Sequence, residues 1–161
     1  MLPQTPSEDQ AESGARQHWL AVLAKAPIAQ LQAAWDALDD KPAYRMLRPG
    51  ETGLVMVRGR IGGTGQKFNF GEMTMTRAAV QLLDRGGQVT QTGFGYVAGR
   101  SVKRAELVAL FDALLQDPAR RDAIARRVVE PLAASQAAAK ATRTAQVMAS
   151  KVDFFTMVRG E

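Results

Sequence analysis

Residues 53–77 read GLVMVRGRIGGTGQKFNFGEMTMTR, two runs of alternating side chains on either side of a glycine-rich centre. This pattern is typical of two β-strands joined by a short turn. On the first strand, predicted over residues 54–61, alternation places Arg58 and Arg60 together on one face. The second strand is predicted over residues 68–83. The stretch therefore predicts a long β-hairpin with charged side chains inside its strands.

A third strand follows the hairpin in the sequence. Residues 84–87, Asp-Arg-Gly-Gly, have the composition of a tight turn, and residues 88–98 again alternate. Three consecutive strands joined by short turns form an antiparallel meander. We expect a bend or bulge at Gly71 in the second strand. Gly93 and Gly95 in the third strand allow another backbone to approach closely.

Helical periodicity precedes the hairpin. Apolar residues recur at three- and four-residue spacing over residues 12–26 and again over residues 27–38. The next segment, residues 43–52, is rich in basic residues and is expected to be a connector. It would include one helical turn around residues 44–47, and Pro49-Gly50 would turn the chain into the sheet.

Helical signals return after the third strand. Ser101 is expected to be the N-cap of a helix, and Asp117-Pro118 to begin another. Pro131 is expected to interrupt that helix. Residues 132–150 are alanine-rich, so they favour a helix whose apolar face is thin and which needs a packing partner. The expected buried face of the first of these helices consists of Leu107, Leu110, Phe111, Leu114 and Leu115.

The end of the chain alternates as a strand does. Residues 151–160 are apolar and aromatic on alternate positions, so we expect a strand that pairs with this sheet or with another subunit. Residues 1–11 are expected to be a disordered leader. The predicted fold is an α+β domain over residues 12–161: an antiparallel β-sheet meander with an additional C-terminal strand, flanked by N-terminal and C-terminal helices. Its segments are helices over 12–38, strands over 53–98, helices over 101–150 and the terminal strand over 151–160.

The composition narrows the function classes. The chain has 161 residues, no cysteine, a net charge of +5 and a sequence pI of about 10.0. A basic chain favours an anionic partner, and the lack of cysteine excludes disulfides and thiolate metal sites. No apolar run approaches the roughly 18 residues needed to span a bilayer. A cytoplasmic location is therefore expected.

Candidate anion-binding or interface residues gather on the predicted sheet. Paired arginines hold phosphate or carboxylate groups in guanidinium forks, and successive glycine N–H groups can face an anion. However, no Gly-Lys-Ser/Thr occurs and a strand follows the loop, which excludes a P-loop. A mobile hairpin loop, a solvated sheet face or a salt-bridge network to a partner explains the same residues, and these alternatives stay open. The candidates are Arg58, Arg60, Gly62, Gly63, Thr64, Gly65, Lys67, Glu72, Arg77 and Arg159.

Other chemistry-bearing residues give weaker signals. His18 is the single histidine, and we expect it to be an ordinary, partly exposed side chain rather than a metal ligand. A basic helix face favours a solvated surface over nucleic-acid binding, because no aromatic residues are interleaved with it. This face consists of Arg120, Arg121, Arg126 and Arg127, opposed by Asp122. No catalytic residue, metal site or cofactor bound by this chain is predicted.

Several segments together resemble the PhnG family, small subunits of the bacterial carbon–phosphorus lyase system. The resemblance is carried by residues 53–65, 68–77, 93–100 and 152–161, with residues 16–24 matching the first helix of the family. Four ordered segments over nearly the whole chain are far more specific than a single glycine motif.

The resemblance implies a role in phosphonate catabolism. With subunits H, I and L, the family takes part in joining methylphosphonate to ATP, with displacement of adenine, to give ribose 1-methylphosphonate 5-triphosphate. It also implies a core assembly with subunits H, I and J, with subunit I as the most intimate neighbour. ATP is then a substrate of the complex, and the family supplies no catalytic residue for this chain.

We therefore expect a structural or substrate-shaping subunit without turnover of its own, which tends to self-associate when alone. The alternatives are a subunit that binds the phosphate or phosphonate directly and, more weakly supported, a basic nucleic-acid-binding module.

Overall fold

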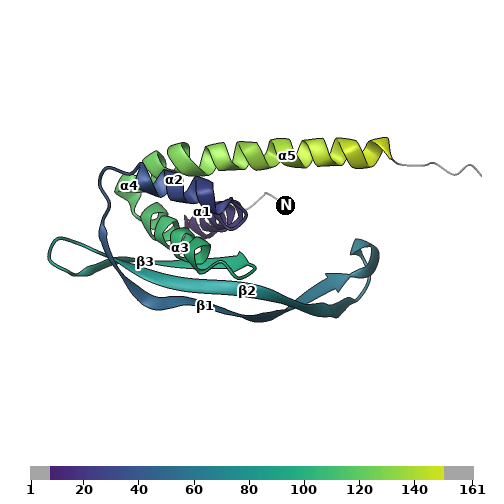
Figure 1. Cartoon of the computed structure of the whole chain (residues 1–161), viewed down its shortest axis with the longest axis horizontal. Helices are drawn as coiled ribbons and strands as arrows, with labels where there is room; N and C mark the ends of the chain where they lie inside the picture. The colour runs from purple at the N-terminus through teal and green to yellow at the C-terminus, as the bar shows by residue number, and fades with distance from the viewer. Residues whose placement is uncertain (1–7, 151–161) are drawn as a thin grey trace, which may run out of the picture.

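The computed structural model describes residues 8–150 as a single sheet with helices packed on one side of it (Figure 1). Two helices come first, three strands follow, and the remaining helices end the described chain. In order, the elements are α1 (Glu8–Leu23), α2 (Ile28–Asp36), β1 (Ala43–Arg60), the short 3-10 helix η1 (Ile61–Gly63), β2 (Lys67–Leu83), β3 (Val89–Ala98), α3 (Val102–Gln116), α4 (Pro118–Ile124), the π-helical turn η2 (Ala125–Val129) and α5 (Glu130–Ala149).

The sheet has the predicted antiparallel order β1-β2-β3. The predicted α+β class, with a meander flanked by N- and C-terminal helices, is confirmed. The expected bulge is present beside Gly71, because Val57 pairs with Gly71 and Arg58 pairs with Asn69, so Phe70 is left without a partner on β1. The predicted strand at residues 151–160 lies outside the described residues.

Helix α3 forms the centre of the core. All residues from Leu107 to Leu115 are buried, including the five apolar residues expected from the sequence. The helix lies directly on β3 because that strand has no side chains where the two meet. A Cβ atom placed on Gly93 would lie 2.0 Å from the carbonyl oxygen of Ala109, and one on Gly95 would lie 1.9 Å from that of Ala105. The close approach predicted for these glycines is thus observed.

The helix boundaries follow local capping chemistry. The Ser101 hydroxyl accepts a hydrogen bond from the backbone N–H of Arg104, and the Asp117 carboxylate accepts one from Ala119. The prediction that Pro131 interrupts the following helix was wrong. The chain stays helical through Pro131, preceded by a π-helical turn that widens the hydrogen-bonding pattern where the proline lacks its N–H.

The segment 43–52 is a strand, so the expected basic connector and helical turn were wrong. Strand β1 begins at Ala43 and passes through Pro49. Its pairing with β2 shifts register on both sides of Arg48, which accommodates the proline. Because β1 is an edge strand, a residue without an N–H is tolerated there. The other correction is at the start, where α1 begins at Glu8, inside the expected leader.

Two parts of the molecule extend beyond the core. The first is the distal end of the β1–β2 hairpin, residues 53–73, which we call the hairpin arm. The second is the C-terminal part of α5, where no residue after Leu132 is buried. Figure 1 shows both projecting to the same side, away from α3. Within residues 8–150, no helix is both long and apolar enough to cross a membrane.

Candidate functional site

The hairpin arm exposes apolar side chains on both of its faces. Phe70 is 76% exposed and Leu54 is 63% exposed, although both are large hydrophobic residues. Soluble chains that function alone seldom present such a contiguous apolar surface, whereas subunit interfaces do. Nothing among residues 8–150 covers the arm. Its other exposed large apolar residues are Val55, Met56, Ile61 and Phe68.

The predicted arginines do not meet at one site. Arg58 pairs with Asn69 near the tip of the arm, whereas Arg77 pairs with Glu51 near its base. Arg58 lies seven positions beyond Glu51 on β1, roughly 23 Å at the usual rise of a strand. The uninterrupted pairing from Glu51 to Val57 also places Arg58 on the opposite face from Arg77. The arrangement therefore consists of two separate basic regions, and Arg159 lies outside the described residues.

At the tip, the glycine loop closes the hairpin. Gly62 and Gly63 have φ angles of +61° and +79°, a backbone conformation that favours glycine. Arg60 turns back over the loop and donates a hydrogen bond through Nη1 to the carbonyl oxygen of Gly65 at 2.9 Å. Arg60 is therefore engaged within the loop. The candidates Thr64, Lys67 and Glu72 are exposed around it.

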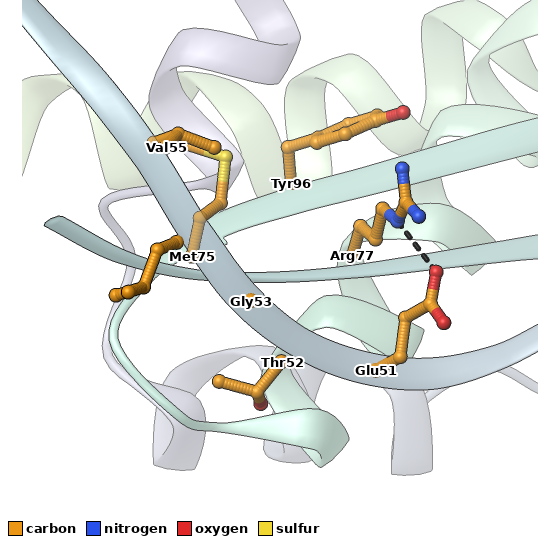
Figure 2. A pocket seen from close by; sticks show the side chains of 8 residues that line it. Glu51, Thr52, Gly53, Val55, Met75, Arg77 and Tyr96 are labelled. Carbon is orange, nitrogen blue, oxygen red and sulfur yellow. Dashed lines mark hydrogen bonds and ion pairs between the residues drawn. The ribbon is translucent and has the colours of Figure 1, made fainter. Parts of the chain in front are cut away.

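The second basic region lies on the face of the sheet that the helices leave open, which we call the outer face. Arg77 donates through Nε to Oε1 of Glu51 at 2.6 Å, and Arg48 donates through Nη1 to the same oxygen at 2.9 Å. Figure 2 shows Arg77 beside Tyr96, with Glu51 facing it and Val55 next to Met75.

Two shallow cavities of about 290 and 500 Å³ adjoin on this face and share Arg77 and Tyr96. We call the combined depression the Arg77 hollow. Its principal lining side chains are Leu47, Arg48, Glu51, Arg77, Phe94 and Tyr96.

Glu51 is the charged partner of both arginines in the hollow. The hydrogen bond from Arg77 lowers the pKa of the Glu51 carboxyl below its ordinary value. Desolvation is the second-largest effect and opposes this shift, whereas the charge of Arg77 and the hydrogen bond and charge of Arg48 each lower the pKa by a smaller amount. Glu51 is therefore ionised at neutral pH, and one carboxylate is shared between two guanidinium groups.

Sequence reasoning missed Asp112, a fully buried carboxylate that joins three elements. Its two oxygens accept hydrogen bonds from Arg16 Nε and Nη2 at 3.1 and 2.7 Å and from Trp19 Nε1 at 2.9 Å. They also accept one from the backbone N–H of Phe94 at 2.9 Å, and Gln116 adds another at 3.2 Å. All of these hydrogen-bond donors belong to this chain, so Asp112 links α1 and α3 to the edge of β3. An aspartate within the otherwise apolar run from Leu107 to Leu115 was the available signal.

The structure also places His18 and the arginines of the basic helix face, the weaker candidates from the sequence. His18 is exposed, in line with an ordinary side chain. On the basic helix face, Arg120 forms an ion pair with Asp40 at 2.9 Å, and Arg121 lies 3.6 Å from Glu12 and over the ring of Trp19. These arginines therefore bind other elements of the same chain. Across the described part of the chain, no group of three or more His, Cys, Asp or Glu residues is placed to hold a metal ion.

Comparison with known proteins gives two consistent findings. The family model described as "Phosphonate metabolism protein PhnG" matches residues 14–160. A protein from Rhizobium meliloti (strain 1021), named alpha-D-ribose 1-methylphosphonate 5-triphosphate synthase subunit PhnG, is 42% identical over 161 residues. That alignment covers 100% of this chain and 99% of the relative, so the similarity includes the core, the hairpin arm and α5 together.

Proposed function

Because this chain belongs to the PhnG family of phosphonate metabolism proteins, we propose that it is a subunit of alpha-D-ribose 1-methylphosphonate 5-triphosphate synthase. The complex would transfer the ribose triphosphate moiety of ATP to methylphosphonate. The bond between the ribose and adenine breaks, an oxygen of the phosphonate bonds to the ribose, and adenine leaves. This subunit would take part in organic phosphonate catabolism as a member of the assembly.

Within that complex the proposed role is architectural. The observation that carries it is the hairpin arm, whose apolar side chains are exposed on both faces. An arm of this kind is stabilised when a partner covers it, because about 25 cal/mol is gained for each Å² of apolar surface removed from water. The outer turns of α5 also lack a covering element within the described chain. Both features support a chain that shapes its partners' site.

The partners proposed are the other carbon–phosphorus lyase subunits. Subunit I would make the most extensive contact with this chain. Subunits H and J would share the core assembly, and subunit L would cooperate in the reaction. ATP and alkylphosphonate would be substrates of the complex, with no cofactor resident on this chain. The cytoplasm is the proposed location.

A direct anion-binding role at the tip of the arm is the second candidate. The side chains of Arg58 and Lys67 have no hydrogen-bond or ion-pair partner among residues 8–150. An unpaired guanidinium and ammonium near the glycine loop would suit the triphosphate or phosphonate of a substrate held by a neighbouring subunit. The two roles are compatible, because the arm would bring these charges to the partner.

Adenine release tests the proposal. ATP and methylphosphonate are supplied to the co-expressed subunits H, I and L, with and without this chain, and to this chain alone. We expect adenine release only when the chain and its partners are present together. Equal release without the chain would overturn its role as a subunit, and release by the chain alone would overturn the architectural role.

A further inference from the structure

The outer face carries an excess of positive charge. Its paired positions include Arg45, Arg48 and Arg77, whereas Glu51 is the acidic residue among them. Arg45 donates to the neutral side chain of Gln81, so it receives no compensating charge there. The arginines at 48 and 77 both contact Oε1 of Glu51, so a single carboxylate serves two cations. The described residues of this face therefore leave two positive charges uncompensated.

The same face offers apolar contacts beside these charges. Tyr96 is 51% exposed and Leu47 is 53% exposed, and Phe94 borders the same depression. Figure 2 shows the Tyr96 ring and the Arg77 guanidinium side by side above Glu51. Aromatic residues and arginine are the side chains most enriched where truncation weakens protein–protein binding. The apolar and cationic groups thus occupy one continuous surface.

We propose that the Arg77 hollow is a docking site for a protein surface of another synthase subunit that presents a carboxylate next to apolar side chains. This inference rests on the proposed function, because it names a contact within the proposed complex. The carboxylate would pair with the guanidinium of Arg77 or Arg48, and the apolar side chains would cover Tyr96, Phe94 and Leu47. The base of the hairpin arm would adjoin this contact, because Gly53, Leu54 and Val55 also line the hollow, whereas the tip of the arm lies farther along the same strands.

The shape of the hollow favours a protein over a nucleotide. Small-molecule sites are concave and bury most of the ligand surface, with polar groups placed at a few points. The Arg77 hollow is partly open to solvent, and residues of all three strands line it. An open surface of mixed aromatic and guanidinium character matches the centre of a subunit interface.

The test uses the complete assembly and a charge series. Hydroxyl-radical footprinting compares Tyr96, Phe94 and Met75 in the isolated chain and in the co-purified complex. We expect labelling of these side chains to fall several-fold in the complex. Arg77→Glu should weaken the affinity for the partner subunits about tenfold or more, as for a residue at the centre of an interface. Arg85→Glu, the same charge change at the exposed β2–β3 turn, should leave the affinity within about twofold.

The Glu51→Gln variant distinguishes two roles for the arginines: binding a carboxylate of a partner subunit, or only pairing with Glu51 within this chain. A partner carboxylate binds at least as tightly when Glu51 no longer competes for the guanidinium groups, so we expect this variant to keep or increase the affinity. Tyr96→Ala should weaken the affinity without changing the fold, as judged by circular dichroism. Equal weakening by Glu51→Gln and Arg77→Glu would overturn the proposal.

The remaining outcomes are equally distinct. If the chain co-purifies and is required for adenine release, but Tyr96 is labelled to the same extent in both states, the docking site fails and the subunit role stands. If ATP binds the isolated chain and Arg77→Glu abolishes that binding, the hollow is a nucleotide site and the proposal is overturned. If the chain neither co-purifies nor supports adenine release, both proposals fail.

Discussion

Arg16 Nη2 lies 2.7 Å from Oδ2 of Asp112, across 96 residues of sequence. The carboxylate is fully buried, and the guanidinium lies at the surface end of the pair. This contact, together with the Trp19 indole on the same carboxylate, fixes the first helix against the central helix. Helix α3, which carries Asp112, also packs on all three strands and so supports the base of the hairpin arm.

Removal of the Asp112 carboxylate should destabilise the fold strongly. Asp112→Ala leaves the Trp19 indole N–H, the Phe94 backbone N–H and the Arg16 charge without their acceptor. Each buried donor left unsatisfied in this way costs about 1–3 kcal/mol of unfolding free energy, whereas the partly exposed Arg16 guanidinium regains water. Urea denaturation of the isolated chain measures the loss. Asp122→Ala, at an exposed position, is the control and should change stability by less than about 0.5 kcal/mol. Similar effects for the two variants would contradict this role.

The contact between β3 and α3 predicts a second stability effect. Gly95→Ala would place a methyl group against the carbonyl oxygen of Ala105, which is backbone and cannot move aside alone. Forcing the helix away from the sheet should cost about 2–3 kcal/mol or prevent folding.

Gly53→Ala is the matched control, since its added methyl group meets nothing within 4 Å. Thermal unfolding followed by circular dichroism compares the two variants. A Gly95→Ala protein as stable as the control would show that the sheet and helix are not packed this closely.

Much of this architecture could be predicted from the sequence. Features that depend on local periodicity and backbone chemistry can be predicted from a single sequence. They include the hairpin, the turn at residues 84–87 and the caps at Ser101 and Asp117. The strand through Pro49 was missed because proline and glycine signal a turn, and only its place at the sheet edge makes a strand possible. The Asp112 contacts join residues distant in sequence, so no local pattern reveals them.

The candidate site was predicted only in part. Arg58 and Arg77 were correctly placed on strands, and their separation follows from the pairing register, which local patterns specify poorly. The Arg77 hollow requires the third strand, because Tyr96 reaches Arg77 only when β3 pairs with β2. Its acidic partner Glu51 lay in the segment expected to be a connector.

The pKa of Glu51 should report the Arg77 contact. Since the folded pKa is lowered, this group contributes stability above its unfolded pKa of about 4.3, and the contribution is lost as the pH falls through the folded value. A carboxyl-carbon NMR titration should place the Glu51 midpoint below about 4.3.

Arg77→Gln should raise that Glu51 midpoint towards the ordinary value, and Arg48→Gln should raise it less, because Arg77 makes the larger contribution. An unchanged midpoint in Arg77→Gln would show that the ion pair is absent in solution.

The charges at the tip of the arm give a separate prediction. Replacing Arg58 and Lys67, the two cations at the tip without a partner among residues 8–150, with alanine should lower adenine release by the complex while leaving its subunit composition unchanged, if they contact a phosphate or phosphonate. Each lost charged hydrogen bond is worth about 1.5–3 kcal/mol, or roughly ten- to hundredfold in activity. Arg85→Ala in the β2–β3 turn is a control for the loss of an exposed arginine. Dissociation of the complex would instead identify Arg58 and Lys67 as interface residues.

Variants of the hairpin arm test whether its exposed apolar side chains hold this chain in the synthase. Native mass spectrometry of the co-expressed complex should be applied to the Leu54→Ser/Phe70→Ser variant, with Ile28→Ser on α2 as an exposed apolar control. We expect the arm variant to fold with unchanged thermal stability, to self-associate less and to be lost from the complex, whereas the control stays bound. An arm variant retained in the complex at full stoichiometry would contradict this expectation.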